Sequence, residues 1–284
     1  MEQLLSTSFD LLSSYDPLHV RKGLRCLEGF LAKMCLQTPS QSRRTSAASS
    51  VGRESYGEGI GGDRGRLKGA VEERPNDAAF MEFMRLQNGF EWNVTIRLIS
   101  CLERLLGRAN NGQTNLLILS ALELIQGMLL LHPPSRKLFA REIHMNVLLD
   151  LLDVGNSGPV QSATLLTLVS ALMDHPENTR SFEALDGLPT ICALFRSPST
   201  PRDVKLRTLE FLYFYLMPEP VTVGPPSAAV GHPPTPLPSG HRGSKSREVR
   251  LDRTTEEKQA LLGEHMQNVE SLVADLRESQ PFGI

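Results

Sequence analysis

HPPSRKLF, residues 132–139, has a near copy further along the chain, HPENTRSF, residues 175–182. Both segments begin with a His-Pro pair, and the phenylalanines that end them, Phe139 and Phe182, are 43 residues apart. Self-similarity at a fixed interval of about 20 to 50 residues is the signature of a repeat architecture. The interval therefore predicts a chain built from repeated supersecondary units.

The helical patterns that follow the two segments repeat as well. Apolar positions keep the same offset at first, so that Met145 aligns with Leu188. After one inserted residue, the pattern V-x-x-x-T-L-x-x-L-x-x-x-L occurs from Val160 and again from Val204. This period is typical of armadillo and HEAT repeats. Each unit has an apolar face that it cannot bury alone, so we predict an all-α, armadillo/HEAT-like solenoid of stacked helices.

Composition sets the predicted domain boundaries in the first part of the chain. Residues 1–37 have helical spacing of apolar side chains and predict N-terminal helices of the solenoid. Residues 38–75 are rich in Ser, Gly and Arg and have too few large apolar side chains to offset the entropy of ordering, which predicts a disordered insertion. The armadillo-like repeats are expected over residues 76–217.

Two further segments follow the repeats. Residues 218–252 are rich in proline, which opposes packed helix and predicts an extended linker. Residues 253–280 have the spacing of an amphipathic C-terminal helix that begins at a capping box, Thr254-x-x-Glu257. The apolar face of this helix must pack somewhere, and the sequence leaves open whether it packs on this chain or on a partner.

Composition and charge restrict the class of partner. The chain has 30 basic and 32 acidic residues, so its net charge of -2 gives no reason to expect nucleic acid or an anionic membrane. No stretch approaches the ~18 unbroken apolar residues of a membrane span, and the first residues lack the basic region of a signal peptide. Four cysteines lie in apolar runs without a Cys-x-x-Cys pair, which favours reduced thiols. We expect a protein of the cytosol or nucleus, and we predict cytoplasmic location, with no nucleic-acid and no membrane partner.

Motifs that carry catalysis are absent from the sequence. It contains no P-loop, dinucleotide-binding, zinc-protease or nucleophile-elbow motif. A cysteine-phosphatase loop is excluded because Cys101 follows Ser100 and Arg108 lies one residue too far along the chain. His132 and His175 each precede proline at a predicted corner, with no second metal ligand at helical spacing. We expect no enzyme activity, cofactor, metal or small-molecule substrate.

Aromatic residues are the candidate partner contacts. Trp92, the only tryptophan, stands at a predicted helix start, where an aromatic anchor for a partner competes with core packing. The run FLYFYL surrounds the last repeat helix with rings, so some of them must face outward. We predict Trp92, Tyr213 and Tyr215 as partner-binding residues.

Short kinase patterns occur in the two segments of low complexity. RRTS, residues 43–46, fits a basophilic kinase, and Thr235-Pro236 fits a proline-directed kinase. Phosphorylation adds about -2 charge, which in such segments tunes binding without unfolding the domain. Ser46 and Thr235 are the predicted modification sites.

Five segments of the chain resemble the fungal cell division control protein 14 family, a septation initiation network component and not the phosphatase of similar name. They cover most of residues 1–217 and read SFDLLSSYDPLHVRKGLRCLEGFLAKMC, FMRLQNGFEWNVTIRLISCLERLLG, LSALELIQGMLLLHPPSRKLFARE, ENTRSFEALDGLPTICALFRS and DVKLRTLEFLYFYLMPE. The resemblance implies a non-catalytic subunit that binds a germinal-centre-type protein kinase. It also implies recruitment to the spindle pole body and a role in septum formation and cytokinesis.

Two other functions remain open from the sequence. A general armadillo-like adaptor for another ligand, such as a peptide or a small GTPase, would have the same fold. An enzyme with an unrecognised active site would need clustered His, Asp, Glu or Cys in a deep pocket, and the spacing of these residues suggests no such cluster.

Overall fold

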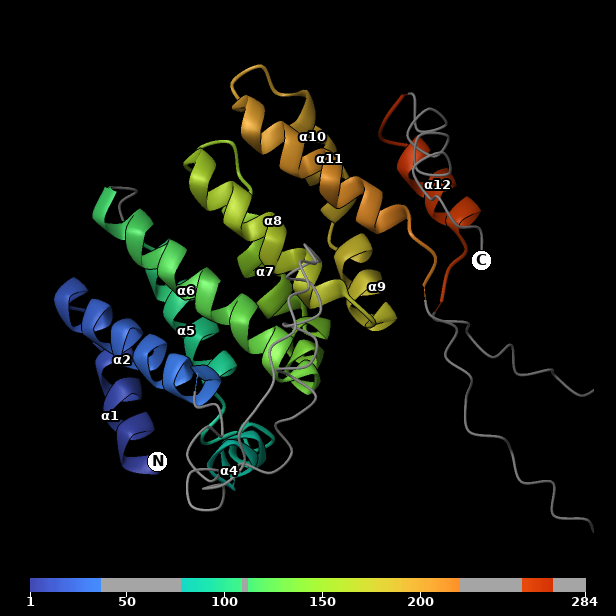
Figure 1. The fold of residues 1–284 in the computed structure, drawn as a ribbon. Helices are drawn as coiled ribbons and strands as arrows, with labels where there is room; N and C mark the ends of the chain where they lie inside the picture. The colour runs from blue at the N-terminus through green and yellow to red at the C-terminus, as the bar shows by residue number, and fades with distance from the viewer. Residues whose placement is uncertain (37–77, 109–111, 220–251, 268–284) are drawn as a thin grey trace, which may run out of the picture. The chain divides into compact units, whose positions relative to one another are not determined.

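The structure is a computed structural model that describes residues 1–36, 78–108, 112–219 and 252–267. Every regular element within these ranges is a helix, so the predicted all-α class is confirmed for them (Figure 1). The chain divides into two compact units, Met1–Ser135 and Arg136–Ile284. The predicted insertion at 38–75 and nearly all of the predicted linker lie outside the described ranges.

The helices described in the first unit pack through α2 and α5. Helix α2 contacts both α1 and α6, and α5 contacts the same two helices. Gly23 of α2 permits a close approach to α1, because a Cβ atom there would lie 3.0 Å from the backbone nitrogen of Leu12. The bounds are α1 (Glu2–Ser13), α2 (Pro17–Leu36), α4 (Ala78–Gln87), α5 (Val94–Leu106) and α6 (Gly112–Leu131).

Two buried amides fix the break between α4 and α5. Asn93 caps α5, with its side-chain oxygen accepting a hydrogen bond from Ile96 N at 3.0 Å. The Gln87 side chain accepts from Val94 N at 2.9 Å and donates to the Trp92 carbonyl at 3.1 Å. These bonds satisfy backbone groups that a helix start would otherwise leave unpaired in the interior.

Helix α6 is apolar on nearly every side. It has 20 residues and a mean hydropathy of 1.7 over its most apolar window, so by length and composition it could cross a bilayer. Half of that window is buried, against α2 and α5. A buried core helix has the same composition as a membrane span, because both have apolar surroundings on all sides.

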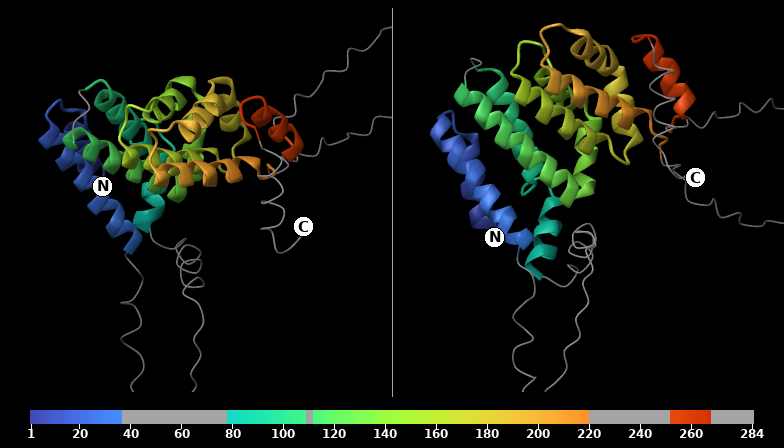
Figure 2. Two further views of the ribbon diagram at one scale, coloured as in Figure 1. Left: turned by 90° about the horizontal axis from the view of Figure 1, so that it is seen from above. Right: turned by 45° about the horizontal axis from the view of Figure 1, so that its top comes forward.

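The second unit is built around two adjacent helices, α8 and α11, which lie side by side (Figures 1 and 2). Helix α7 packs on α8, α10 packs on α11, and α9 contacts α7, α8 and α10. The 3-10 helix η1 (Pro133–Ala140) contains the boundary between the units. The remaining bounds are α7 (Glu142–Leu151), α8 (Gly158–Leu172), α9 (Pro176–Ala184), α10 (Gly187–Arg196), α11 (Arg202–Leu216) and α12 (Thr255–Gly263).

The sequence repeat is visible in the local structure of this second unit. Helices α7 and α10 have 10 residues each, and α8 and α11 have 15 each. Phe139 and Phe182 are both fully buried. Thr164 and Thr208 are also fully buried, and each hydroxyl donates at 2.8 Å to the carbonyl four residues earlier. Equivalent positions thus have equivalent environments, whereas the stacking of repeats into a solenoid stays a prediction.

The two His-Pro corners differ in detail. The first continues as the 3-10 helix η1, and the second begins the α-helix α9. At the first corner, His132 is 6% exposed, with its ring nitrogens 2.8 Å from Ser135 Oγ and 3.2 Å from Asn88 Oδ1. At the second, buried Asn178 donates to the carbonyls of Arg136 and Ala171. Each corner therefore has a buried polar side chain that forms hydrogen bonds with neighbouring polar groups.

Candidate functional site

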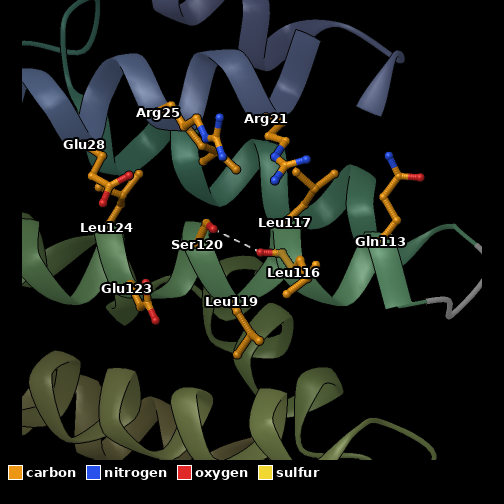
Figure 3. A pocket seen from close by; sticks show the side chains of 11 residues that line it. Arg21, Arg25, Glu28, Gln113, Leu116, Leu117, Leu119, Ser120, Glu123 and Leu124 are labelled. Carbon is orange, nitrogen blue, oxygen red and sulfur yellow. Dashed lines mark hydrogen bonds between the residues drawn. The ribbon is translucent and has the colours of Figure 1, made fainter. Parts of the chain in front are cut away.

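Helices α2 and α6 of the first unit border a groove of about 580 Å³ (Figure 3). Its floor is apolar, since Leu24 of α2 and Leu117 and Leu124 of α6 are 2%, 4% and 9% exposed. Leu116 of α6 also lines the groove but keeps 63% of its surface exposed. Leu116 and this floor together form an apolar groove open to solvent, and grooves of this kind occur at binding sites.

The two ends of the groove carry opposite charges. Arg21 of α2 lies toward one end, Arg25 lies between Arg21 and Glu28, and Glu28 of α2 and Glu123 of α6 lie toward the other end (Figure 3). All four residues are exposed, and none forms an ion pair or side-chain hydrogen bond with another residue of the described ranges. Their charges are therefore available to a ligand.

A smaller hollow of about 270 Å³ adjoins the basic end of the groove. It shares Arg21 and Arg25 with the groove and adds Leu18, Lys22 and Cys26, all from α2. Leu18 is 65% exposed, and Lys22 is exposed without an ion-pair partner in the described part of the chain. Three cations thus surround an exposed leucine at this end.

Helical periodicity explains why α2 presents this surface. Positions 18, 21, 22 and 25 follow the spacing i, i+3, i+4, i+7, which places their side chains on one face of a helix. Leu24, Leu27 and Leu31 occupy the opposite, core-facing positions and are buried. The same helix therefore packs the first unit with one face and offers a mixed basic and apolar surface with the other.

The chemistry of the groove suits the binding of side chains. Leucines offer apolar contact, arginines offer paired donors for carboxylates, and glutamates accept from cations. The one hydroxyl among its lining residues, that of Ser120, donates to the Leu116 carbonyl at 3.1 Å within α6 (Figure 3). No cluster of three or more His, Cys, Asp or Glu suited to a metal ion occurs in the described ranges.

A second polar cluster holds α12 on the end of α11, and we call it the C-terminal clasp. Lys258 of α12 is 3% exposed, and its Nζ atom lies 3.0 Å from Glu219 and donates to the Met217 carbonyl at 2.9 Å. Glu219 also lies 2.7 Å from Arg180, and the Arg253 side chain lies 3.2 Å from Glu183. The clasp consists of Arg180, Glu183, Glu219, Arg253 and Lys258.

Burial and charge shift the protonation equilibria at the clasp. Burial lowers the pKa of Lys258, and its hydrogen bond to Glu219 opposes that shift. Burial raises the pKa of Tyr215, helped by the negative charge of Glu183, to which the tyrosine hydroxyl donates at 2.7 Å. The described part of the C-terminal helix thus packs on this chain, through buried charges as well as through Leu262, which is fully buried.

The predicted partner-binding residues lie in different places. Trp92 is half-buried, and its ring stacks on Phe9 with centroids 6.3 Å apart. Tyr213 is half-buried on α11. Tyr215 is 1% exposed, and Lys258 Nζ lies 5.3 Å from the centre of its ring, so a partner reaches it only if α12 leaves. None of the three lines the groove.

The predicted modification sites, Ser46 and Thr235, lie outside the described residues. The groove residues are the ones that the sequence did not single out. Their one sequence signal is the basic pair Arg21 and Arg25 beside an apolar Leu18, at a spacing that puts them on one helix face. Leu116 has no such signal, because it lies in an unbroken apolar run.

Comparison with known proteins identifies the family. The family model described as "Cell division control protein 14, SIN component" matches residues 1–282. A curated protein named cell division control protein 14, from Schizosaccharomyces pombe, is 31% identical over 209 residues, which are 71% of this chain and 78% of the relative. No solved structure matches the chain significantly. This protein therefore belongs to the cell division control protein 14 family, a septation initiation network component in cell division.

Proposed function

We propose that this protein is a non-catalytic regulatory or scaffold subunit that binds a germinal-centre-type protein kinase in the septation initiation network and promotes septum formation and cytokinesis. The observation that carries the proposal is the groove between α2 and α6, which offers leucines and unpaired charges of both signs to another chain. Membership of the family indicates the process, septation in cell division, and the resemblance to the family implies the kinase.

Binding accounts for the chemistry of the groove better than catalysis does. Catalytic acids and bases act from enclosed sites where burial and neighbouring groups perturb their pKa values. The arginines and glutamates of the groove are exposed. They are the groups that an interface uses at its rim to select and orient a partner. No enzyme activity, cofactor or small-molecule substrate is part of the proposal.

The proposal includes an armadillo-like solenoid. Its support is the equivalence of Phe139 with Phe182 and of Thr164 with Thr208 in burial and hydrogen bonding. Repeated units of this kind bury their apolar faces by stacking on one another and thereby form long binding surfaces. A scaffold needs such a surface more than it needs a deep pocket.

The proposed location follows from the process. A subunit of this network works in the cytoplasm and is recruited to the spindle pole body together with its kinase. The proposal includes no nucleic-acid and no membrane partner, which fits the net charge of -2.

A general adaptor for another protein or peptide is the second candidate. The groove favours it as much as a kinase subunit, because leucines and charges of both signs recognise any chain of complementary pattern. The two candidates differ in the identity of the bound protein, which the experiment must therefore establish.

Affinity purification of the tagged protein from dividing cells, with mass spectrometry and a kinase assay of the eluate with and without this chain, tests the proposal. A stoichiometric germinal-centre kinase whose activity or location depends on the chain is expected. Recovery of no kinase would overturn the proposal, as would recovery of a kinase whose activity and location do not depend on this protein.

Matched variants of α6 test the contribution of the groove. Leu116 and Leu130 are both exposed, at 63% and 53%, but only Leu116 lines the groove. Leu116→Ser should lower kinase recovery by about tenfold, because an apolar anchor at an interface contributes at least that much. Leu130→Ser should leave it unchanged. Equal recovery with both variants would exclude the groove as the contact.

A further inference from the structure

The cations and anions of the groove are segregated along its length. Arg21, Lys22 and Arg25 lie in the N-terminal half of α2. Glu28 follows Arg25 by less than one helical turn and Arg21 by about two turns, and Glu123 lies toward the Glu28 end from α6. At a rise of 1.5 Å per residue, Glu28 is about 5 Å along the helix axis from Arg25 and about 10 Å from Arg21.

Leucines lie beside the charged residues along the groove, with Leu116 and Leu117 near Arg21 and Leu124 near Glu28 (Figure 3). Leu24, Leu117 and Leu124 form the buried floor, and Leu116 stands open to solvent at its edge. An apolar strip bordered by charged side chains is complementary to an amphipathic helix, whose apolar face lies in the strip while polar side chains reach the rims.

We propose that the groove binds an amphipathic helix of the partner protein whose apolar stripe is bordered by acidic residues toward one end and by basic residues one to two turns further along. The acidic residues pair with Arg21 and Arg25, and the basic residues pair with Glu28 and Glu123. The inference rests on the proposed function, of which it specifies the docking element of the partner.

Charge complementarity selects this occupant over other classes. Nucleic acid and anionic lipid would meet repulsion from the two glutamates in the same groove. A uniformly apolar helix would leave all four charges facing it without partners, which costs affinity on desolvation. A helix with segregated charges satisfies every charged group that lines the groove.

Synthetic peptides test the inference with the full-length protein. The probe is an amphipathic peptide of about four turns with leucines on one face, glutamates beside them in its first half and lysines in its second half. The control peptide has the same composition with the two charges alternating along its length. Fluorescence anisotropy should give at least about tenfold tighter binding of the probe, equivalent to about 1.4 kcal/mol.

Protein variants separate specific pairing from general attraction. Arg21→Glu with Arg25→Glu should reduce binding of the probe to the level of the control peptide, whereas Arg21→Lys with Arg25→Lys should retain most of it. Lys137→Glu with Arg202→Glu makes the same change in net charge at exposed positions of the second unit and should have no effect. Bound probe should also slow modification of Cys26 by a maleimide, because Cys26 lines the adjoining hollow.

Equal binding of the two peptides would overturn the inference. Unchanged probe binding by the variant with Arg21→Glu and Arg25→Glu would also overturn it. A tenfold gain in probe affinity on deletion of residues 268–284 would also overturn it, because the chain's own segment would then be the occupant. Purification from cells distinguishes the two proposals. If the Arg21→Glu, Arg25→Glu variant recovers as much kinase as the unaltered protein, only the inference about the groove fails. If no kinase is recovered but the protein still prefers the probe peptide, only the proposed function fails.

Discussion

Lys258 and Glu219 form a buried ion pair, with 3.0 Å between the ammonium nitrogen and the carboxylate, and they join α12 to the end of α11. The side chains of both residues are largely removed from solvent, at 4% and 7% exposed. A pair in such surroundings is stable only when additional hydrogen bonds satisfy its members. The Met217 carbonyl and the Arg180 guanidinium supply those bonds here.

Lys258→Met should loosen α12 without unfolding the rest of the second unit. Removal of one member of a buried pair leaves the other charge uncompensated, and because Arg180 still pairs with Glu219 we expect a cost of about 2–3 kcal/mol. Hydrogen exchange of the α12 amides should accelerate by about 30-fold to 150-fold. Lys137→Met, at an exposed position, is the control. Unchanged exchange in α12 would mean that the pair does not hold the helix.

Phe139→Ala and Phe182→Ala should have similar effects on stability. Both rings are 0% exposed, and they occupy equivalent positions of the internal repeat. Truncation of a buried phenylalanine leaves a cavity and costs about 3–5 kcal/mol. Urea unfolding of the two variants measures these losses. A large loss in one variant and almost none in the other would show that the equivalence in sequence does not extend to packing energy.

The stability of the first unit should decrease as the pH falls below the ordinary histidine value of 6.5. Burial lowers the pKa of His132, so the unfolded chain binds a proton that the folded chain does not bind between the two pKa values. The loss is at most about 1.4 kcal/mol per pH unit in that window. Urea unfolding at pH 7, 6 and 5 should reveal it, and His132→Gln should remove this component. Parallel pH profiles for the two proteins would contradict the prediction.

The four thiols should react with alkylating reagents at very different rates. Burial raises the pKa of Cys101 to about 11 and raises the pKa of Cys192, so both are protonated thiols inside the protein. Cys26 and Cys35 are only half-buried. Mass spectrometry after brief iodoacetamide treatment at pH 8 should find Cys26 and Cys35 modified first, with Cys101 and Cys192 modified only in denaturant. Early modification of Cys101 would contradict the burial described.

The repeat and the helices could be predicted because each produces a periodic spacing of apolar residues over a short stretch of sequence. Helix α5 begins at Val94, two residues after Trp92, which stands at a predicted helix start, and the two copies of the repeated pattern, from Val160 and from Val204, lie within α8 and α11. The capping box of Thr254 and Glu257 is present with both of its hydrogen bonds. The helix predicted over 253–280 is described only over Thr255–Gly263, and residues 268–280 lie outside the described ranges.

The groove could not be predicted, because it depends on how far apart α2 and α6 lie. In the sequence, Leu116 and Leu117 are neighbours in one apolar run, yet they are 63% and 4% exposed. The clasp was missed for a related reason. Lys258 has the sequence context of a surface lysine, and its partner Glu219 lies in a segment that composition assigns to the linker. Contacts between residues distant in sequence leave no periodic pattern.

The clasp also brings the chain back to the point from which it departs. The Arg253 amide donates to the Glu219 carboxylate at 2.9 Å, so these two residues, 34 positions apart in the sequence, lie in contact. For a loop with joined ends, doubling the length changes the closure free energy by only about 0.6 kcal/mol. Insertions and deletions between these two residues therefore cost the fold little, which leaves this stretch free to change in length during evolution and makes it a suitable place to insert a fluorescent protein.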